Sequence, residues 1–168
     1  MKAAIVIALC AVACKGGGSG STVDGSTGSG SCAIDASSLG ITWTFNGTVY
    51  SGSLLATATL QTDAVGGNSL GIMASDSNGG VLAITASPAT AQSQIAQGLY
   101  STSTTTPLAT FELTSGGSTW TATGSGGSGG INITWLITTE MQAVFSATMV
   151  GSDGSGALTN GALDLMVN

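Results

Sequence analysis

Apolar and polar residues alternate along the chain from Ile41 onward. A period of two is the pattern of a β-strand that buries one face. In the opening stretch, Ile41, Trp43 and Phe45 share one face, and Asn46-Gly47 follows directly. Because Asn-Gly accepts the positive φ angles of a type I′ turn, this stretch predicts a tight hairpin.

Strand-like segments recur to the end of the chain, separated by Gly-rich or Asx-Gly turns. A second hairpin is predicted from residues 70–75 and 81–85, with its turn at 76–80. The other predicted strands are residues 54–61, 99–102, 108–113, 119–123, 131–137, 141–150 and 158–167. Eight to ten short strands with frequent turns predict an all-β domain, an antiparallel β-sandwich, with a small β-barrel as the alternative.

The stretch INITWLI predicts which side chains of one strand form the core. Ile131, Ile133, Trp135 and Ile137 share a face by strict alternation. Trp135 is therefore expected in the core. Trp43, on the apolar face of the opening stretch, is expected there too.

One segment predicts a short helical turn, at residues 87–98. Pro88 suits the first turn of a helix, and Gly98 suits its C-terminal stop.

The charge distribution is one-sided. The basic residues of the 168-residue chain are Lys2 and Lys15, and residues 33–168 carry seven acids and no cation. A surface without cations repels phosphates, so nucleic acid is excluded as a partner. Solubility must come from hydroxyl and amide groups, which suits a location outside the cell.

The N-terminus, MKAAIVIALCAVA, has a basic residue followed by an apolar run too short to span a bilayer. This predicts a signal peptide at residues 1–13. The small residues before Cys14 are similar to the lipobox of bacterial lipoproteins, which predicts lipidation of Cys14 and anchoring in the outer membrane or at the cell surface. They also form an A-x-A site, so a secreted protein is the alternative.

Residues 14–32 form a Gly/Ser-rich tether with a reach on the order of 23 Å. Cys32 ends this tether and precedes the β domain predicted at residues 33–168. Because Cys14 is assigned to the lipid, Cys32 is left as an odd cysteine. It is a disulfide link to a second copy, a free thiol or a small buried residue.

Several of these features occur together in a known family. The chain has the lipobox, the Gly/Ser tether, WTFNGTVYSG, QGLYST, VFSATM and the ending LTNGALDLMV. In this it resembles small single-domain lipoproteins of Bacteroidetes-type bacteria. The resemblance implies an anchored β-sandwich on the cell envelope, with no established activity to carry over.

The residue inventory excludes most catalytic chemistry. A hydrolase triad lacks its base, since the chain has no His. A glycosidase pair would need the glutamates Glu112 and Glu140, which we interpret as solvated acids. Weak calcium ligands are Asp76, Asn78 and Asp153, and turn chemistry accounts for them without a metal or any other cofactor.

Glycan binding is the ligand hypothesis that survives, because aromatic rings, amides and hydroxyls recognise sugars without cations. Trp120, Tyr50 and Tyr100 are the candidate contacts, since Trp120 has few apolar neighbours on its face and the tyrosines stand near turns. The alternative function is self-assembly through strand edges, which carry no Lys to block pairing. The sequence thus predicts a non-enzymatic, lipid-anchored binding or structural module.

Overall fold

The computed structural model describes residues 40–102, 108–124 and 126–168. These residues form eleven strands in one sheet and no helix. The strands are β1 (Gly40–Phe45), β2 (Thr48–Ser51), β3 (Leu55–Thr62), β4 (Asn68–Ser75), β5 (Val81–Ser87), β6 (Gly98–Ser101), β7 (Leu108–Ser115), β8 (Ser118–Ala122), β9 (Ser128–Leu136), β10 (Glu140–Gly151) and β11 (Gly154–Met166). The all-β prediction is confirmed.

Five of the strands close into a ring. In spatial order β10, β9, β6, β7 and β8 each pair with the next, and β8 pairs back to the end of β10. The hairpins extend this ring on both sides, with β5, β4 and β3 beyond β7 and β11, β1 and β2 beyond β10. The closed ring corresponds to the small-barrel alternative rather than to the two separate sheets of a sandwich.

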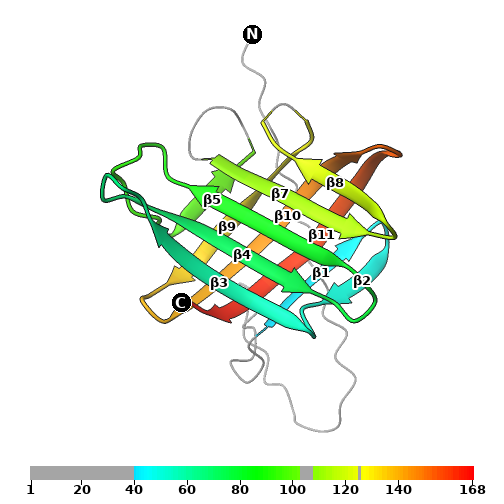
Figure 1. Ribbon diagram of the computed structural model, residues 1–168, viewed down its shortest axis with the longest axis horizontal. Helices are drawn as coiled ribbons and strands as arrows, with labels where there is room; N and C mark the ends of the chain where they lie inside the picture. Colours follow the sequence, from blue (N-terminus) through cyan, green and yellow to red (C-terminus); the bar gives the residue numbers. More distant parts are fainter. Residues whose placement is uncertain (1–39, 103–107, 125) are drawn as a thin grey trace, which may run out of the picture. The chain divides into compact units, whose positions relative to one another are not determined.

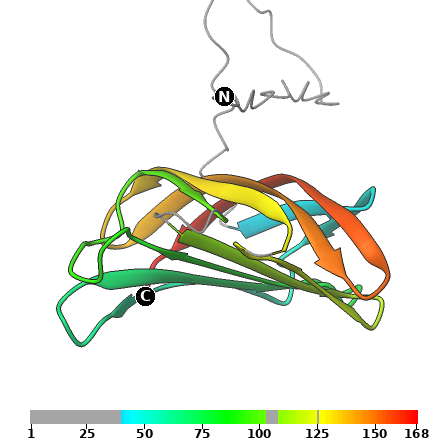
Figure 2. The ribbon, with the colours of Figure 1, turned by 90° about the horizontal axis from the view of Figure 1, so that it is seen from above.

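The barrel is flattened into two layers (Figure 1). One layer contains β3, β4, β5, β7 and β8, and its strands cross over β9, β10, β11 and β1 of the other. The view from above separates these layers (Figure 2). Each strand therefore has one face on the shared interior and one face on the outside.

The interior is built from alternate residues of every long strand. In β1, Ile41, Trp43 and Phe45 are buried as predicted, and β10 buries every second residue from Met141 to Met149. Aromatic rings connect the layers: Phe111 of β7 contacts Phe145 of β10, with ring centroids 6.3 Å apart. The period of two in the sequence thus produces one continuous core.

The first hairpin has the predicted turn. Asn46 and Gly47 both have positive φ angles, 48° and 83°. Thr48 pairs directly with Phe45, so the loop has two residues. The second predicted hairpin also forms, as β4 and β5.

The prediction that Trp135 and Ile137 lie in the core is wrong. Ile133 pairs with Ala143 while Trp135 pairs with Gln142, so Thr134 is an extra residue in β9. This bulge reverses the alternation. Trp135 is 47% exposed and Ile137 43%, and Leu136 packs against the core in their place.

The predicted helical turn at 87–98 is also wrong, because this segment forms bends without a helix. Its polar groups are satisfied by side chains instead of by the backbone hydrogen bonds of a helix. The Ile95 N–H donates to Asn68 Oδ1, and Tyr100 Oη bonds both the N–H and the carbonyl of Ala96. Burial of Ile95 then holds the segment on the core.

The chain after β11 joins the two layers a second time. Val167 forms a parallel bridge with Ala58 of β3. The Asn168 N–H donates to the Ala58 carbonyl at 3.0 Å, and the Leu60 N–H donates to the Asn168 carbonyl at 3.2 Å. These bonds occupy the middle of the outer edge of β3.

Candidate functional site

The aromatic residues proposed from the sequence as ligand contacts lie inside the protein. Trp120 and Tyr50 are each 8% exposed, and Tyr100 is 6% exposed. Trp120 packs edge-on against Phe45, with ring centroids 5.2 Å apart, and Tyr50 stacks on Trp43 at 5.5 Å. The hydroxyl of Tyr50 lies 2.8 Å from Ser115 Oγ. None of these three rings presents a face to a ligand in solution.

The bulge in β9 instead places Trp135 on the outside. Trp135 lies directly opposite Gln142 of β10, and Gln142 lies opposite Asp164 of β11. Side chains at directly opposed positions share one face of a sheet. Trp135, Gln142 and Asp164 therefore form a row across three strands on the outer surface.

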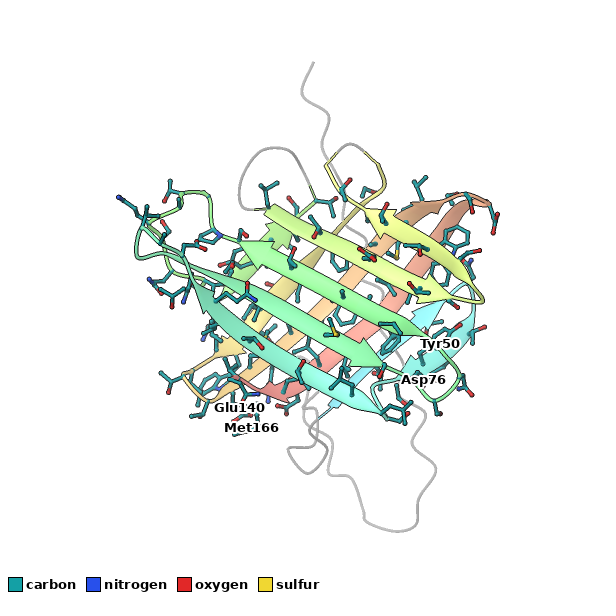
Figure 3. All side chains as sticks on the ribbon, in the orientation of Figure 1. Tyr50, Asp76, Glu140 and Met166 are labelled. Carbon is teal, nitrogen blue, oxygen red and sulfur yellow. The ribbon has the colours of Figure 1, made fainter. Side chains whose placement is uncertain are left out.

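Neighbouring rows complete this surface. One row is Leu99, Asn132 and Val144, from β6, β9 and β10. Another is the pair Glu140 and Met166, which lie together at the end of the layer (Figure 3). We call the whole set the Trp135 face, and it consists of Leu99, Asn132, Trp135, Glu140, Gln142, Val144, Asp164 and Met166.

The Trp135 face has an apolar periphery and a polar centre. Leu99, Val144 and Met166 are 50%, 46% and 51% exposed, similar to Trp135. Between them, Gln142 Nε2 donates a hydrogen bond to Asp164 Oδ2 at 3.1 Å. Exposed apolar side chains that gather on one face of a protein are typical of an interaction site.

Asp164 is 1% exposed although it is on the outer face, and Asp76, at 4%, is the other buried acid among the described residues. Its neighbours along β11, Leu163 and Leu165, point into the core. Asp164 Oδ1 is buried and has no hydrogen-bond partner among the described residues.

A shallow groove lies beside the β9–β10 turn. It has a volume of about 570 Å³ and connects the two layers and the 95–97 loop. Its lining is mainly apolar: Leu60, Ile95, Ala96, Gln97, Leu136, Ile137 and Thr138. Leu136, which lines the groove, directly follows Trp135 in the chain. The groove therefore adjoins the Trp135 face.

The calcium candidates have structural partners. Asp76 directly follows β4 and lies close to Tyr50 (Figure 3). Its Oδ2 accepts from the Ser51 N–H at 2.8 Å, and its Oδ1 accepts from the Asn78 N–H at 2.6 Å. Both backbone bonds lower the pKa of Asp76, and the bond from Ser51 has the larger effect.

Asp153 is exposed and accepts from two hydroxyls, Ser118 Oγ at 3.0 Å and Ser152 Oγ at 3.1 Å. Over the described ranges, no three His, Cys, Asp or Glu side chains are grouped as metal ligands. Asp76, Asn78 and Asp153 therefore have the hydrogen bonds of turns rather than of a calcium cage.

The two glutamates are on different layers. Glu112 is exposed on β7, opposite Ala83 and Thr121. Glu140 begins β10 in the other layer and is half-buried on the Trp135 face. The fold does not bring them to one cleft as a carboxylate pair.

The predicted signal peptide, Cys14, the tether and Cys32 lie outside the described residues. Among the residues that are described, there is no helix with the length and hydropathy needed to cross a membrane. No family model, curated protein or solved structure matches the chain.

Proposed function

We propose that this protein is a non-enzymatic envelope module that binds neutral glycans on its Trp135 face. The observation that carries this proposal is the exposed Trp135 indole in one row with the half-buried amide of Gln142. Asp164, the third residue of the row, is 1% exposed. An indole ring stacks on the apolar face of a sugar, while amide and carboxylate groups bond its hydroxyls.

Charge defines the ligand class. The described ranges contain no Lys, Arg or His, and the Trp135 face carries Glu140 and Asp164. An anionic polysaccharide would meet only repulsion there. The surface therefore favours uncharged sugars.

The proposal also covers where the protein is located in the cell. The apolar leader and the small residues before Cys14 support export and a lipid anchor, and the tether would let the domain stand clear of the membrane. Intact mass of protein extracted from the membrane fraction tests this. Acyl chains on Cys14 are expected, whereas an unmodified chain in the medium contradicts the anchor and leaves a secreted binding module. A doubled mass that reduction halves assigns Cys32 to a dimer.

The alternative of assembly through strand edges has less support. The sheet ends at β2 and β3. The Ser51 N–H at the edge of β2 is bonded to Asp76, and Ala58 and Leu60 at the edge of β3 are bonded to Asn168. Occupied edge groups cannot pair with another copy.

Affinity electrophoresis through gels containing dextran, mannan, laminarin or hydroxyethylcellulose tests glycan binding. The full chain is expected to be retarded by at least one of these neutral polymers and not by polygalacturonate. Trp135→Ala is expected to abolish the retardation. Met73→Ala is the matched control, because Met73 is 48% exposed on the outer face of the opposite layer. Equal retardation of both variants, or no retardation of the full chain, contradicts the proposal.

A further inference from the structure

The two carboxylate oxygens of Asp164 differ in their hydrogen bonding. One of its oxygens, Oδ2, accepts from Gln142, while Oδ1 is buried without a partner in residues 40–102, 108–124 and 126–168. A buried carboxylate oxygen without a donor is destabilising, and such groups are uncommon in folded proteins. No cation in the described residues offsets the charge.

The buried carboxylate of Asp164 does not lie in the core. It lies on the outer side of β11, in the same row as Trp135, two strands away. Two strand spacings amount to roughly 10 Å. Gly40 lies opposite Asp164 on its other side and adds no side chain to this row.

We propose that Asp164 recognises the glycan, with Oδ1 accepting a hydrogen bond from a hydroxyl of a sugar chain that stacks on Trp135. This inference rests on the proposed function and adds the ligand's size and one of its contacts. Because the distance from Trp135 to Asp164 is longer than one sugar ring, the ligand is an oligosaccharide or polysaccharide rather than a monosaccharide.

Gln142 is the positioning residue in this arrangement. It is half-buried between Trp135 and Asp164, and its amide holds Oδ2. The proposal requires the side chains that bury Asp164 to move on binding, because Asp164 is 1% exposed in the structure. Binding thereby supplies the donor that the free protein lacks.

Other occupants of the Trp135 face fit less well. A metal ion would need further ligands, and the described residues supply no such group. A second copy of the chain would bring two sets of Glu140 and Asp164 together without a described cation between them. A neutral hydroxyl donor avoids both problems.

The substitution Asp164→Asn tests the proposal because it keeps the shape and changes the chemistry. The amide oxygen can still accept from Gln142, which leaves an N–H₂ donor in place of Oδ1. Affinity for the polymer that retards the full chain is expected to fall about tenfold, because a charge-assisted bond to Oδ1 is replaced by a weaker neutral bond between N–H₂ and the hydroxyl oxygen. The urea midpoint is expected to stay equal or rise, since a buried charge has been removed. Asp153→Asn, an exposed acid elsewhere, is the control.

The outcomes separate the two proposals. If Trp135→Ala loses binding while Asp164→Asn keeps full affinity, the glycan site remains and the role of Asp164 is overturned. If Asp164→Asn lowers the urea midpoint and leaves affinity unchanged, Asp164 is structural. If the full chain forms a dimer that Trp135→Ala dissociates, the face is a self-interface and both proposals fail.

A measurement on the unsubstituted protein avoids dependence on a variant's folding. The chain is labelled with ¹³C-aspartate, and an oligosaccharide of the polymer that retards the full chain is added. The carboxyl resonance of Asp164 is expected to shift, and that of Asp76 is not. An unmoved Asp164 resonance at saturation overturns the inference.

Discussion

The carboxylate of Asp76 accepts a hydrogen bond from the backbone N–H of Ser51 at 2.8 Å, across 25 positions of sequence. Ser51 is the last residue of the edge strand β2, and Asp76 is the first residue after β4. The same carboxylate also accepts from the Asn78 N–H within its own turn. One side chain thus closes the β4–β5 turn and covers a donor at the sheet edge.

We expect Asp76→Asn to lower the urea midpoint at pH 7, because an amide cannot accept both backbone bonds as strongly as a carboxylate does. The backbone bonds hold the folded-state pKa of Asp76 below its unfolded value. Its stabilisation is therefore complete above the unfolded pKa of about 3.9 and is lost as the pH falls through the folded pKa. The difference in midpoint between Asp76→Asn and the unsubstituted chain should shrink from pH 5 downward.

Asp153→Asn serves as the control for this pH dependence, because Asp153 is exposed and has only serine hydroxyls as partners. Its midpoint should follow that of the unsubstituted chain at every pH. A pH-independent deficit in Asp76→Asn would show that the carboxylate charge is not what stabilises the turn.

Gly161 tests the packing between β10 and β11. A Cβ at this position would lie 2.2 Å from Cδ2 of Phe145, a ring that is 4% exposed. Since the buried ring cannot move freely, Gly161→Ala should destabilise the fold by about 1–3 kcal/mol. Chemical denaturation checks the value against Gly71→Ala, where the nearest atom is the Thr59 carbonyl oxygen at 4.0 Å. Equal stability of the two variants would contradict the packing of Phe145 on Gly161.

Most of the strands were predictable because their side chains alternate and their turns have characteristic residues. The Asn46-Gly47 turn and the buried face of β1 are examples. The closure of the ring was not predictable, since the pairing of β8 with both β7 and β10 depends on contacts between distant segments. The prediction for residues 87–98 failed partly for the same reason, because Asn68, distant in sequence, accepts from the Ile95 N–H.

The candidate site was missed because the alternation of INITWLI was extended through the bulge. Trp135, Leu136 and Ile137 are three successive apolar residues, and a strand with one face toward solvent cannot bury all three. That run was the available signal that some of them are exposed. The burial of Asp164 had no such signal, because it depends on the register that places Gln142 beside it.

Fluorescence can check the placement of the three tryptophans. Trp135 is 47% exposed, whereas Trp43 and Trp120 are 1% and 8% exposed. Acrylamide should therefore quench part of the emission of the unsubstituted chain. In Trp135→Phe this quenchable part should be missing, and the remaining emission should lie at shorter wavelength. Trp43→Phe should retain the quenchable fraction. If Trp135→Phe quenches like the unsubstituted chain, the bulge is misplaced and the Trp135 face does not exist as described.

The bridge between Val167 and Ala58 leads to a prediction about the edge of β3. Removal of Val167 and Asn168 eliminates two backbone hydrogen bonds to β3 and a side chain that is 9% exposed. At 0.5–1.5 kcal/mol per bond, the loss of these two bonds should cost about 1–3 kcal/mol. It also leaves the Ala58 carbonyl and the Leu60 N–H unpaired at the sheet edge, which should promote association between copies.

Asn168→Ala isolates the backbone contribution, because the two bonds to β3 come from the main chain of this residue. This variant should keep the urea midpoint of the full chain and its mass in light scattering. The shortened chain should unfold at lower urea and form larger species as its concentration rises. If the shortened chain is instead as stable and as monomeric as Asn168→Ala, the contact with β3 neither joins the layers nor protects the edge, and self-assembly regains its place beside glycan binding.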